Sequence, residues 1–263
     1  MNGTINNMEK IELRDNLFQY FFIKDDDGHT NSIYVCVDAA RQKALVLDAA
    51  FQDCAAEVKK DLAAQGIVPE IVVLSHYHPD HAGGLTVFKD CRIYVSEYYR
   101  DNFENCQRWR PDLTFLRPTD LLKDGAALAF GGFNLKFIHA PGHSKCTLMT
   151  SINNDVLHIG DLLMFTADGQ LTLPYISMGG SFKEHIESLE RIKSTPCHIL
   201  AFAHGHVLTD EKARAGALDD WLYYLNRVQD SMGTLPLAVC LKNDISTYAN
   251  TEYHDNNLMY LLL

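Results

Sequence analysis

The chain has 263 residues, enough for one large domain or two small ones with a sizeable buried core. Its hydrophobic content of 47% and its charged content of 22% are typical of a globular protein. The formal net charge of -11 produces an averaged field that repels polyanions, so nucleic acid is not expected as a partner.

The start of the chain and its cysteines indicate a cytoplasmic protein. The first residues, MNGTINNMEKIEL, lack the apolar core of a signal peptide, and no apolar run is long enough to span a bilayer. The 7 cysteines are scattered, and none forms a CxxC pair. We therefore expect no membrane contact, and reduced cysteines that mostly fill the core.

Strands and helices alternate along both halves of the chain, which predicts a layered α/β domain. Ser181 and Glu184 form a capping box at the start of one expected helix. We expect a single domain over residues 1–263 with a helical extension from about residue 209. The pattern after Gly233 is weak, and the terminal LMYLLL is expected to be a buried strand or a packed terminus. The expected strands cover 17–24, 31–37, 43–49, 70–75, 92–96, 134–144, 146–152, 155–161 and 197–206, and the expected helices cover 53–66, 97–109, 181–194 and 210–232.

The most distinctive stretch is LSHYHPDHAGG, residues 74–84, which continues the apolar strand over 70–75. In extended backbone, residues two apart point to the same side, so His76 and His78 can present their imidazoles together. Pro79 holds His78 away from helical angles and keeps this segment extended.

The second half of this stretch adds two more ligand-type residues. Asp80 continues the alternation and His81 breaks it, so the stretch can aim two side chains at one point and two at a neighbouring point. Zinc and related divalent metals accept imidazole and carboxylate ligands. Gly83 and Gly84 permit a tight turn into a helix that we expect to begin near Leu85. The stretch therefore predicts part of a metal site.

Three other strand ends carry residues of the same kinds. His143 follows a Pro-Gly turn in HAPGHS, and Asp161 follows a glycine in LHIGDLL. His204 and His206 both lie in AFAHGHVLTD. Each pattern alone is a weak signal, because a histidine or an aspartate at one turn is usually structural. Their order and their placement at strand ends together are a much stronger signal for a metal site.

The HxHxDH motif, followed by the His of APGHS, the Asp of HIGD and the His of AHG, resembles the metallo-β-lactamase-fold hydrolases, with their glyoxalase II and lactonase branch as the best match. The resemblance covers the chain from Leu17 to Leu208. It implies an α/β fold, an αββα sandwich of two mixed β-sheets with helices on the outer faces. It also implies a dinuclear site in which His76, His78 and His143 hold the first metal, Asp80, His81 and His204 hold the second, and Asp161 bridges both.

The last ligand can be chosen in two ways. The stretch AHGHVLTD is similar to the family pattern GHGPVL, which selects His204, whereas a glycine directly before the ligand would select His206. We favour His204, and His206 then stands at the mouth of the cleft, where it could touch the substrate. Tyr175, between two of the ligand loops, is a second candidate for substrate binding. The other histidines, namely His29, His139, His158, His185, His198 and His254, are interpreted as core or surface residues.

The resemblance implies two divalent metal ions, with zinc favoured and iron or manganese as alternatives. Such a pair stabilises a bridging hydroxide near neutral pH and polarises the substrate oxygen, and Asp80 could accept a proton during turnover. We expect hydrolysis of a small-molecule ester, thioester or lactone. The family's lactonases commonly have a tyrosine three residues after the bridging aspartate, where this chain has Met164, and this weakens the lactonase reading. A phosphodiesterase, a mononuclear iron persulfide dioxygenase, a non-catalytic metal-binding protein and a homodimer stay open.

Overall fold

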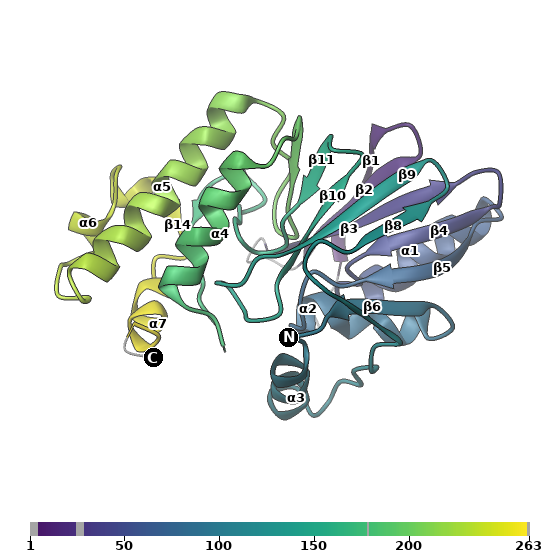
Figure 1. Cartoon of the computed structure of the whole chain (residues 1–263), viewed down its shortest axis with the longest axis horizontal. Helices are drawn as coiled ribbons and strands as arrows, with labels where there is room; N and C mark the ends of the chain where they lie inside the picture. The colour runs from purple at the N-terminus through teal and green to yellow at the C-terminus, as the bar shows by residue number, and fades with distance from the viewer. Residues whose placement is uncertain (1–4, 25–28, 178, 262–263) are drawn as a thin grey trace.

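Two mixed β-sheets packed face to face, with helices on their outer faces, form the sandwich that the resemblance implies (Figure 1). The computed structural model describes residues 5–24, 29–177 and 179–261. The helices α1 (Gln52–Ala64) and α3 (Arg100–Trp109) lie on the side of the first sheet, and α4 (Phe182–Ser194) and α5 (Glu211–Asp230) lie on the side of the second. The expected fold class is confirmed.

The first sheet is antiparallel in its first half and parallel in its second half. Sequence reasoning missed its two edge strands. The first has mostly exposed or half-buried side chains and therefore no clear apolar face, and the last has only 3 residues. In the described part of the chain its strands are β1 (Ile5–Arg14), β2 (Leu17–Lys24), β3 (His29–Asp38), β4 (Lys43–Leu47), β5 (Val68–Val73), β6 (Arg92–Ser96) and β7 (Asp120–Leu122).

The second sheet has the strand order β13-β11-β10-β9-β8, and only the β11–β13 pair is parallel. A separate short pair, β12 with β14, joins the middle of the chain to its C-terminal part. The strands are β8 (Ala127–Phe130), β9 (Phe133–His139), β10 (Leu148–Ile152), β11 (Val156–His158), β12 (Leu171–Thr172), β13 (Ile199–Ala201) and β14 (Tyr248–Ala249).

Alternate side chains of β3 pack on opposite faces of the first sheet. Tyr34 and Cys36 point into the apolar cluster between the two sheets, where they join Phe137 from the second sheet. Ile33 and Val35 point the other way, into the cluster beneath α1 and α3. A strand that is buried on both faces needs apolar residues at every position, which explains the continuous apolar run in this part of the sequence.

The helix α4 begins where the sequence gives a start signal. The Ser181 Oγ accepts a hydrogen bond from the Glu184 backbone N–H at 3.3 Å, which confirms Ser181 as the N-cap. The Glu184 carboxylate accepts from the Ser181 hydroxyl at 2.9 Å.

After Gly233 the described chain forms short helices and β14. Of the two expectations for LMYLLL, the strand is wrong for the described residues and the packed terminus is confirmed, because Leu258, Tyr260 and Leu261 pack against the apolar cluster that contains Trp221. The remaining helical segments are α2 (Pro79–Ala82), η1 (Gly83–Phe88), α6 (Leu237–Cys240), η2 (Ile245–Thr247) and α7 (Tyr253–Met259).

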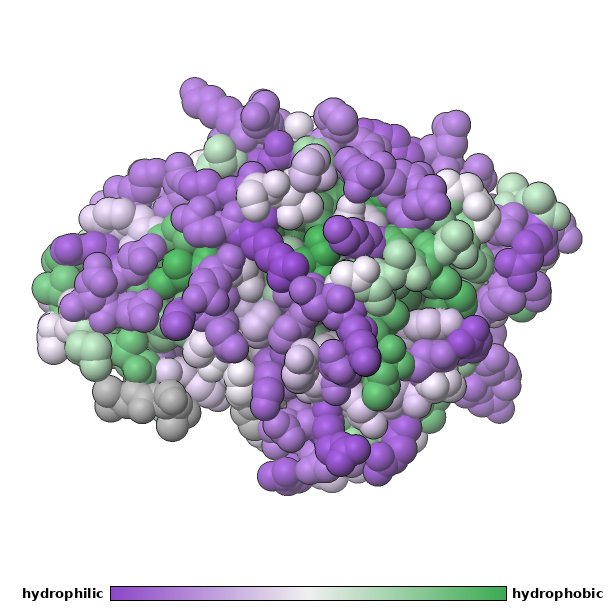
Figure 2. Space-filling view, viewed as in Figure 1, coloured by the Kyte–Doolittle hydropathy of each residue, from purple (hydrophilic) through white to green (hydrophobic). Residues whose placement is uncertain are grey.

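The surface and the cysteines agree with the composition. Hydrophilic residues cover most of the face seen in Figure 2, with hydrophobic residues in smaller areas between them. All 7 cysteines are free thiols, and all except Cys197 are buried. Among the described residues, no helix combines the length and the apolar character that crossing a membrane requires.

The prediction of a turn at Gly83 and Gly84 before a helix near Leu85 is wrong. The helix α2 already begins at Pro79, where proline suits the first helical position, and it runs directly into η1. The Gly84 N–H donates to the Ala50 carbonyl at 2.9 Å, so the glycines let this helical segment pack against the loop after β4. This close packing sets the position of the ligand residues in α2.

We predict that Gly84→Ala destabilises the protein far more than Gly83→Ala. A Cβ at position 84 would lie 2.2 Å from the Ala49 carbonyl oxygen, whereas at position 83 the nearest atom would be 3.5 Å away. Overpacking costs about 1–3 kcal/mol, and alanine is otherwise favoured over glycine in a helix by about 1 kcal/mol. Urea denaturation of the two variants measures the difference. Equal unfolding midpoints would contradict the close packing of Gly84.

Candidate metal centre

Three imidazoles from two loops converge on one point. His76 and His78 lie in the extended segment after β5, and His143 lies in the loop after β9. His76 Nε2 is 3.0 Å from His78 Nδ1, and His143 Nε2 is 3.2 Å and 3.1 Å from these two atoms. Asp161, in the loop after β11, places Oδ2 3.7 Å from His76 and 3.5 Å from His143. All four side chains are buried.

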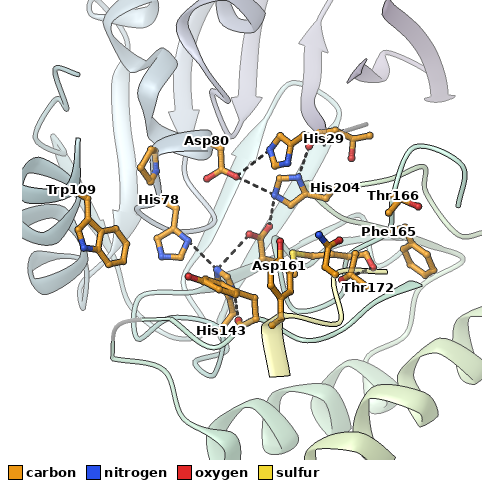
Figure 3. Close-up of a pocket in the computed structure, with 16 residues that line it drawn as sticks. His29, His78, Asp80, Trp109, His143, Asp161, Phe165, Thr166, Thr172 and His204 are labelled. Atoms are coloured by element: carbon orange, nitrogen blue, oxygen red, sulfur yellow. Dashed lines mark hydrogen bonds and ion pairs between the residues drawn. The ribbon is translucent and has the colours of Figure 1, made fainter. Parts of the chain in front are cut away.

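The first group consists of His76, His78, His143 and Asp161. A second group, made of Asp80, His81 and His204, shares Asp161 with it. His81 Nε2, from α2, lies 3.2 Å from Asp161 Oδ1. His204 Nε2, in the loop after β13, lies 3.5 Å from the same oxygen and 3.3 Å from Asp80 Oδ2. Figure 3 shows Asp161 between His143 on one side and His204 on the other. The carboxylate of Asp161 therefore connects the two groups.

Hydrogen bonds on the outer side of the first group hold the rings. His143 Nδ1–H donates to the Tyr175 carbonyl oxygen at 2.6 Å. The Ser177 hydroxyl donates its proton to the His143 carbonyl oxygen at 2.9 Å, so its oxygen accepts from His78 Nε2–H at 2.9 Å. His143 thus carries its proton on the outer nitrogen Nδ1, and His78 carries its proton on the outer nitrogen Nε2. The inner nitrogens, which face the centre of the group, each keep a lone pair.

The buried carboxylate of Asp48 orients two further rings, those of His76 and His81. Ser75 Oγ donates to Asp48 Oδ2 at 2.8 Å, and can therefore accept from His76 Nδ1–H at 3.1 Å. His81 Nδ1–H donates directly to Asp48 Oδ2 at 3.1 Å. In the second group, His204 Nδ1–H donates to the Thr30 carbonyl oxygen. Every outer nitrogen of the five rings therefore faces an acceptor.

This donor set fits divalent metal ions. Inner nitrogens with lone pairs, 3.0 to 3.2 Å apart in the first group, repel one another unless a cation lies between them. Ligand atoms about 2.0–2.1 Å from a tetrahedral zinc ion are about 3.3 Å from one another, which is close to the spacing in both groups. Imidazole with carboxylate suits zinc, iron and related metals.

The protonation of the rings agrees with this fit. Burial lowers the pKa of His78 to about 3 and that of His143 to about 4, so both are neutral at pH 7. Burial also acts to lower the pKa of His204, but the carboxylates of Asp161 and Asp80 outweigh it and raise this pKa to about 10. A cation that binds the second group must therefore displace a proton.

The two groups open into a cavity of about 470 Å³ (Figure 3), within the usual size range for small-molecule sites. Tyr175 lines it, as expected. His206 is exposed, and its ring packs against Phe21 at 3.9 Å between centroids, so the described structure does not bring it into the cavity. Besides the ligand candidates and His29, the lining residues are Thr30, Pro79, Trp109, Met164, Phe165, Thr166, Thr172, Tyr175, Asn250 and Tyr253.

The structure brings together all seven residues that the resemblance selects as ligands, and their binding of metal stays a prediction. Sequence reasoning missed His29, whose Nε2 lies 3.8 Å from Asp80 Oδ2 at the cavity. It also missed Asp48, although a carboxylate directly after a buried strand was the signal that found Asp161. Nothing in the sequence signals Ser177 or Tyr253, because their roles depend on distant parts of the chain.

The chain belongs to the metallo-beta-lactamase superfamily, because the family model matches residues 25–204. A hydroxyacylglutathione hydrolase from Bdellovibrio bacteriovorus is 26% identical over 176 residues, which are 65% of this chain and 62% of that protein. The human acyl-coenzyme A thioesterase MBLAC2 is 29% identical over 162 residues, 51% of this chain and 56% of that protein. The matches thus span less than two thirds of these relatives.

A solved structure is similar over nearly the whole fold. The metallo-beta-lactamase family protein from Thermus thermophilus has a TM-score of 0.67 at 18% identity, with 92% of this chain and 93% of that chain covered. Identity at this level concerns the fold alone, and it agrees with the two-sheet architecture described above.

The C-terminal helix α7 supports the ligand candidate His143 through the backbone around Tyr175. Asn257, which is fully buried, accepts from the Ile176 N–H at 2.9 Å and donates to the Pro174 carbonyl at 2.7 Å. These two bonds clamp both neighbours of Tyr175, and the carbonyl of Tyr175 is the acceptor for His143 Nδ1–H. A residue near the C-terminus is therefore linked to the first group through one short backbone segment.

We predict that Asn257→Asp weakens the first metal site by about tenfold, the lower end for outer partners of metal ligands. The new carboxylate can still accept from Ile176 but cannot donate to Pro174. Competition with a chromophoric chelator measures the affinity. The control is Asn226→Asp, which removes a bond to Leu222 on α5 that does not lead to the site. A folded Asn257→Asp protein with unchanged metal affinity would show that this link is not needed.

We predict that the protein binds two divalent metals per chain and that Asp161→Ala lowers this number. His204→Ala should lose one metal and nearly all turnover, because its Nε2 faces both carboxylates of the second group. His206→Ala should keep both metals, because its ring lies on Phe21. Elemental analysis of the purified variants checks these numbers. A metal lost from the His206 variant, with none lost from the His204 variant, would reverse the assignment.

Proposed function

We propose that the protein is a dinuclear metal-dependent hydrolase that acts on a small ester, thioester or lactone. The observation that carries this proposal is the shared carboxylate of Asp161. It lies between two groups of imidazole donors at the floor of one open cavity. Two metal ions that share one carboxylate ligand would be close enough to act on the same substrate bond. Zinc is proposed as the metal, with iron or manganese as alternatives.

The comparisons support a thioester or a related acyl compound as the substrate. The two relatives described above are named as a hydroxyacylglutathione hydrolase and an acyl-coenzyme A thioesterase, and both names describe thioester hydrolysis. The family alone would not select a substrate, since one fold supports many reactions. We therefore propose a small molecule with an acyl group as the partner of the cavity, in a cytoplasmic protein.

When bound, the metal ions supply a nucleophilic water near neutral pH and polarise the carbonyl oxygen of the substrate. The carboxylate of Asp161 contacts both donor groups and so fixes their position relative to one another. Asp80 faces the second group through Oδ2, and in the proposal it receives the proton that the water gives up. The water oxygen would form a bond to the acyl carbon, the C–S or C–O bond would break, and the proton held by Asp80 would go to the leaving sulfur or oxygen. The products would be a carboxylic acid and a thiol or alcohol, or one hydroxy acid from a lactone.

We predict turnover of acyl thioesters, aryl esters or lactones by protein loaded with zinc or manganese, and no turnover after metal removal by a chelator. The Asp161→Ala variant should lose at least about a hundredfold in kcat/KM, since both donor groups lose a shared ligand. Bis-nitrophenyl phosphate and a persulfide with iron-loaded protein complete the panel. Hydrolysis of the phosphodiester alone, or rapid oxygen consumption with the persulfide alone, would replace this proposal.

A further inference from the structure

Beyond the ligand candidates, the described lining of the cavity has one imidazole, that of His29, whose Nε2 lies 3.8 Å from Asp80 Oδ2. Among the described residues that line the cavity, no lysine or arginine occurs. The residues outside the described ranges, which are MNGT, DDDG, Met178 and two leucines, contain no lysine or arginine either. A substrate that carries carboxylates away from the reacting bond would therefore find no lysine or arginine in the described lining, and His29 faces the carboxylate of Asp80. Burying an unpaired carboxylate against apolar walls is costly.

Aromatic rings frame the half of the cavity next to the first group. The Trp109 ring lies 6.3 Å from the His78 ring and is 49% exposed, which is unusual for a tryptophan in a folded protein. The Tyr175 ring lies 6.0 Å from the His143 ring, and the Tyr253 ring lies 4.9 Å from that of Tyr175. Figure 3 shows Trp109 beside His78, on the opposite side of the ligand candidates from Phe165 and Thr172.

The tyrosine wall is held in place by the C-terminal segment. Asn256 Nδ2 donates to the Ile176 carbonyl at 2.9 Å, next to the bonds that Asn257 makes with the same segment. Parallel pairing of β12 with β14 fixes the chain just before Asn250 and Tyr253. Since these contacts are made by buried or half-buried groups, the wall is part of the folded structure and does not need a substrate to form.

The arginines next to Trp109 in the sequence are paired with acids. Arg110 makes two hydrogen bonds to Asp112, at 2.8 Å and 2.6 Å. Arg108 lies 3.8 Å from Glu104 on the same helix. Neither lines the cavity. The cations nearest in sequence to the exposed indole are therefore engaged with carboxylates of their own.

We propose that the cavity selects substrates in which the group next to the hydrolysed bond is neutral and apolar, an aryl or alkyl acyl group that lies between Trp109 and the Tyr175–Tyr253 pair. It discriminates against carriers with carboxylates, such as glutathione. This inference rests on the proposed function and narrows it, because the relative named as a hydroxyacylglutathione hydrolase would act on an anionic carrier. The unreactive part of the substrate provides binding energy through apolar contact with the rings.

The first experiment compares two thioesters with the same acyl group on zinc-loaded protein. Phenylacetyl-N-acetylcysteamine has a neutral carrier, and S-phenylacetylglutathione has a carrier with two carboxylates. We expect kcat/KM to be at least about tenfold higher for the neutral thioester, since unpaired buried charges reject a substrate strongly. Equal values, or a preference for the glutathione thioester, would overturn the inference. Hydrolysis of neither compound would count against the proposed function and leave the binding test below to decide the inference.

Binding can be measured without turnover, because the chain has 2 tryptophans and the other, Trp221, is fully buried. Titration with S-benzyl-N-acetylcysteamine should change the tryptophan fluorescence, and S-benzylglutathione should bind at least about tenfold more weakly. The fluorescence change should disappear in Trp109→Phe. Equal affinities for the two thioethers, or a change that persists in this variant, would contradict the inference whatever the activity.

A variant pair tests the tyrosine wall. Tyr253→Ala should raise KM for the neutral thioester by about tenfold with kcat nearly unchanged, because it removes contact that is equally strong before and during the reaction. The control is Tyr223→Ala, which changes an exposed tyrosine on α5 outside the cavity lining and should leave both constants unchanged. An unchanged KM in a folded Tyr253→Ala protein would show that the ring does not contact the substrate.

Discussion

The rest of the structure depends on the crowding of five imidazoles and two carboxylates around one small volume. Such groups are costly to bury, so each needs a partner that holds it in place. The partners come from separate parts of the chain: Asp48 after β4, the Thr30 carbonyl on β3, and the Tyr175 carbonyl between β12 and α4. No single loop could supply these acceptors, and the arrangement therefore requires the folded sandwich.

The two sheets contribute to the site at strand ends that meet on one edge of the sandwich. His76 and His78 extend β5 of the first sheet, whereas His143 and Asp161 follow β9 and β11 of the second. The spacing between the two parts of the site is thus set by the apolar layer between the sheets, which includes Phe137. A change in the packing of that layer would move the halves of each donor group relative to one another, even though no ligand side chain would be altered.

Much of the fold and most of the candidate site could be predicted from the sequence, because the signals were local. Ser181 was a correct helix cap, since a capping box is complete within four residues. The extended backbone at His78 was also correct, because proline restricts the residue before it. The prediction of a turn at Gly83 was wrong, because the chain is already helical there. Gly84 serves close packing against Ala49, about thirty-five positions earlier, which no local pattern reveals.

The C-terminal segment was the least predictable part of the chain, and it contributes Asn250 and Tyr253 to the cavity. Its residues Asn250, Tyr253 and Asn257 have ordinary local surroundings in the sequence, and their importance arises only because the pairing of β12 with β14 places them beside Tyr175. The same segment adds the ring of Tyr253 to those of Trp109 and Tyr175 in the wall. Metal ions bound at the floor would then be the main positive charge in the cavity, so a polar carbonyl oxygen would be drawn to the floor while an apolar acyl group stays against the rings. Orientation of the substrate would follow from this separation of charge and apolar surface, without a lysine or an arginine in the described walls.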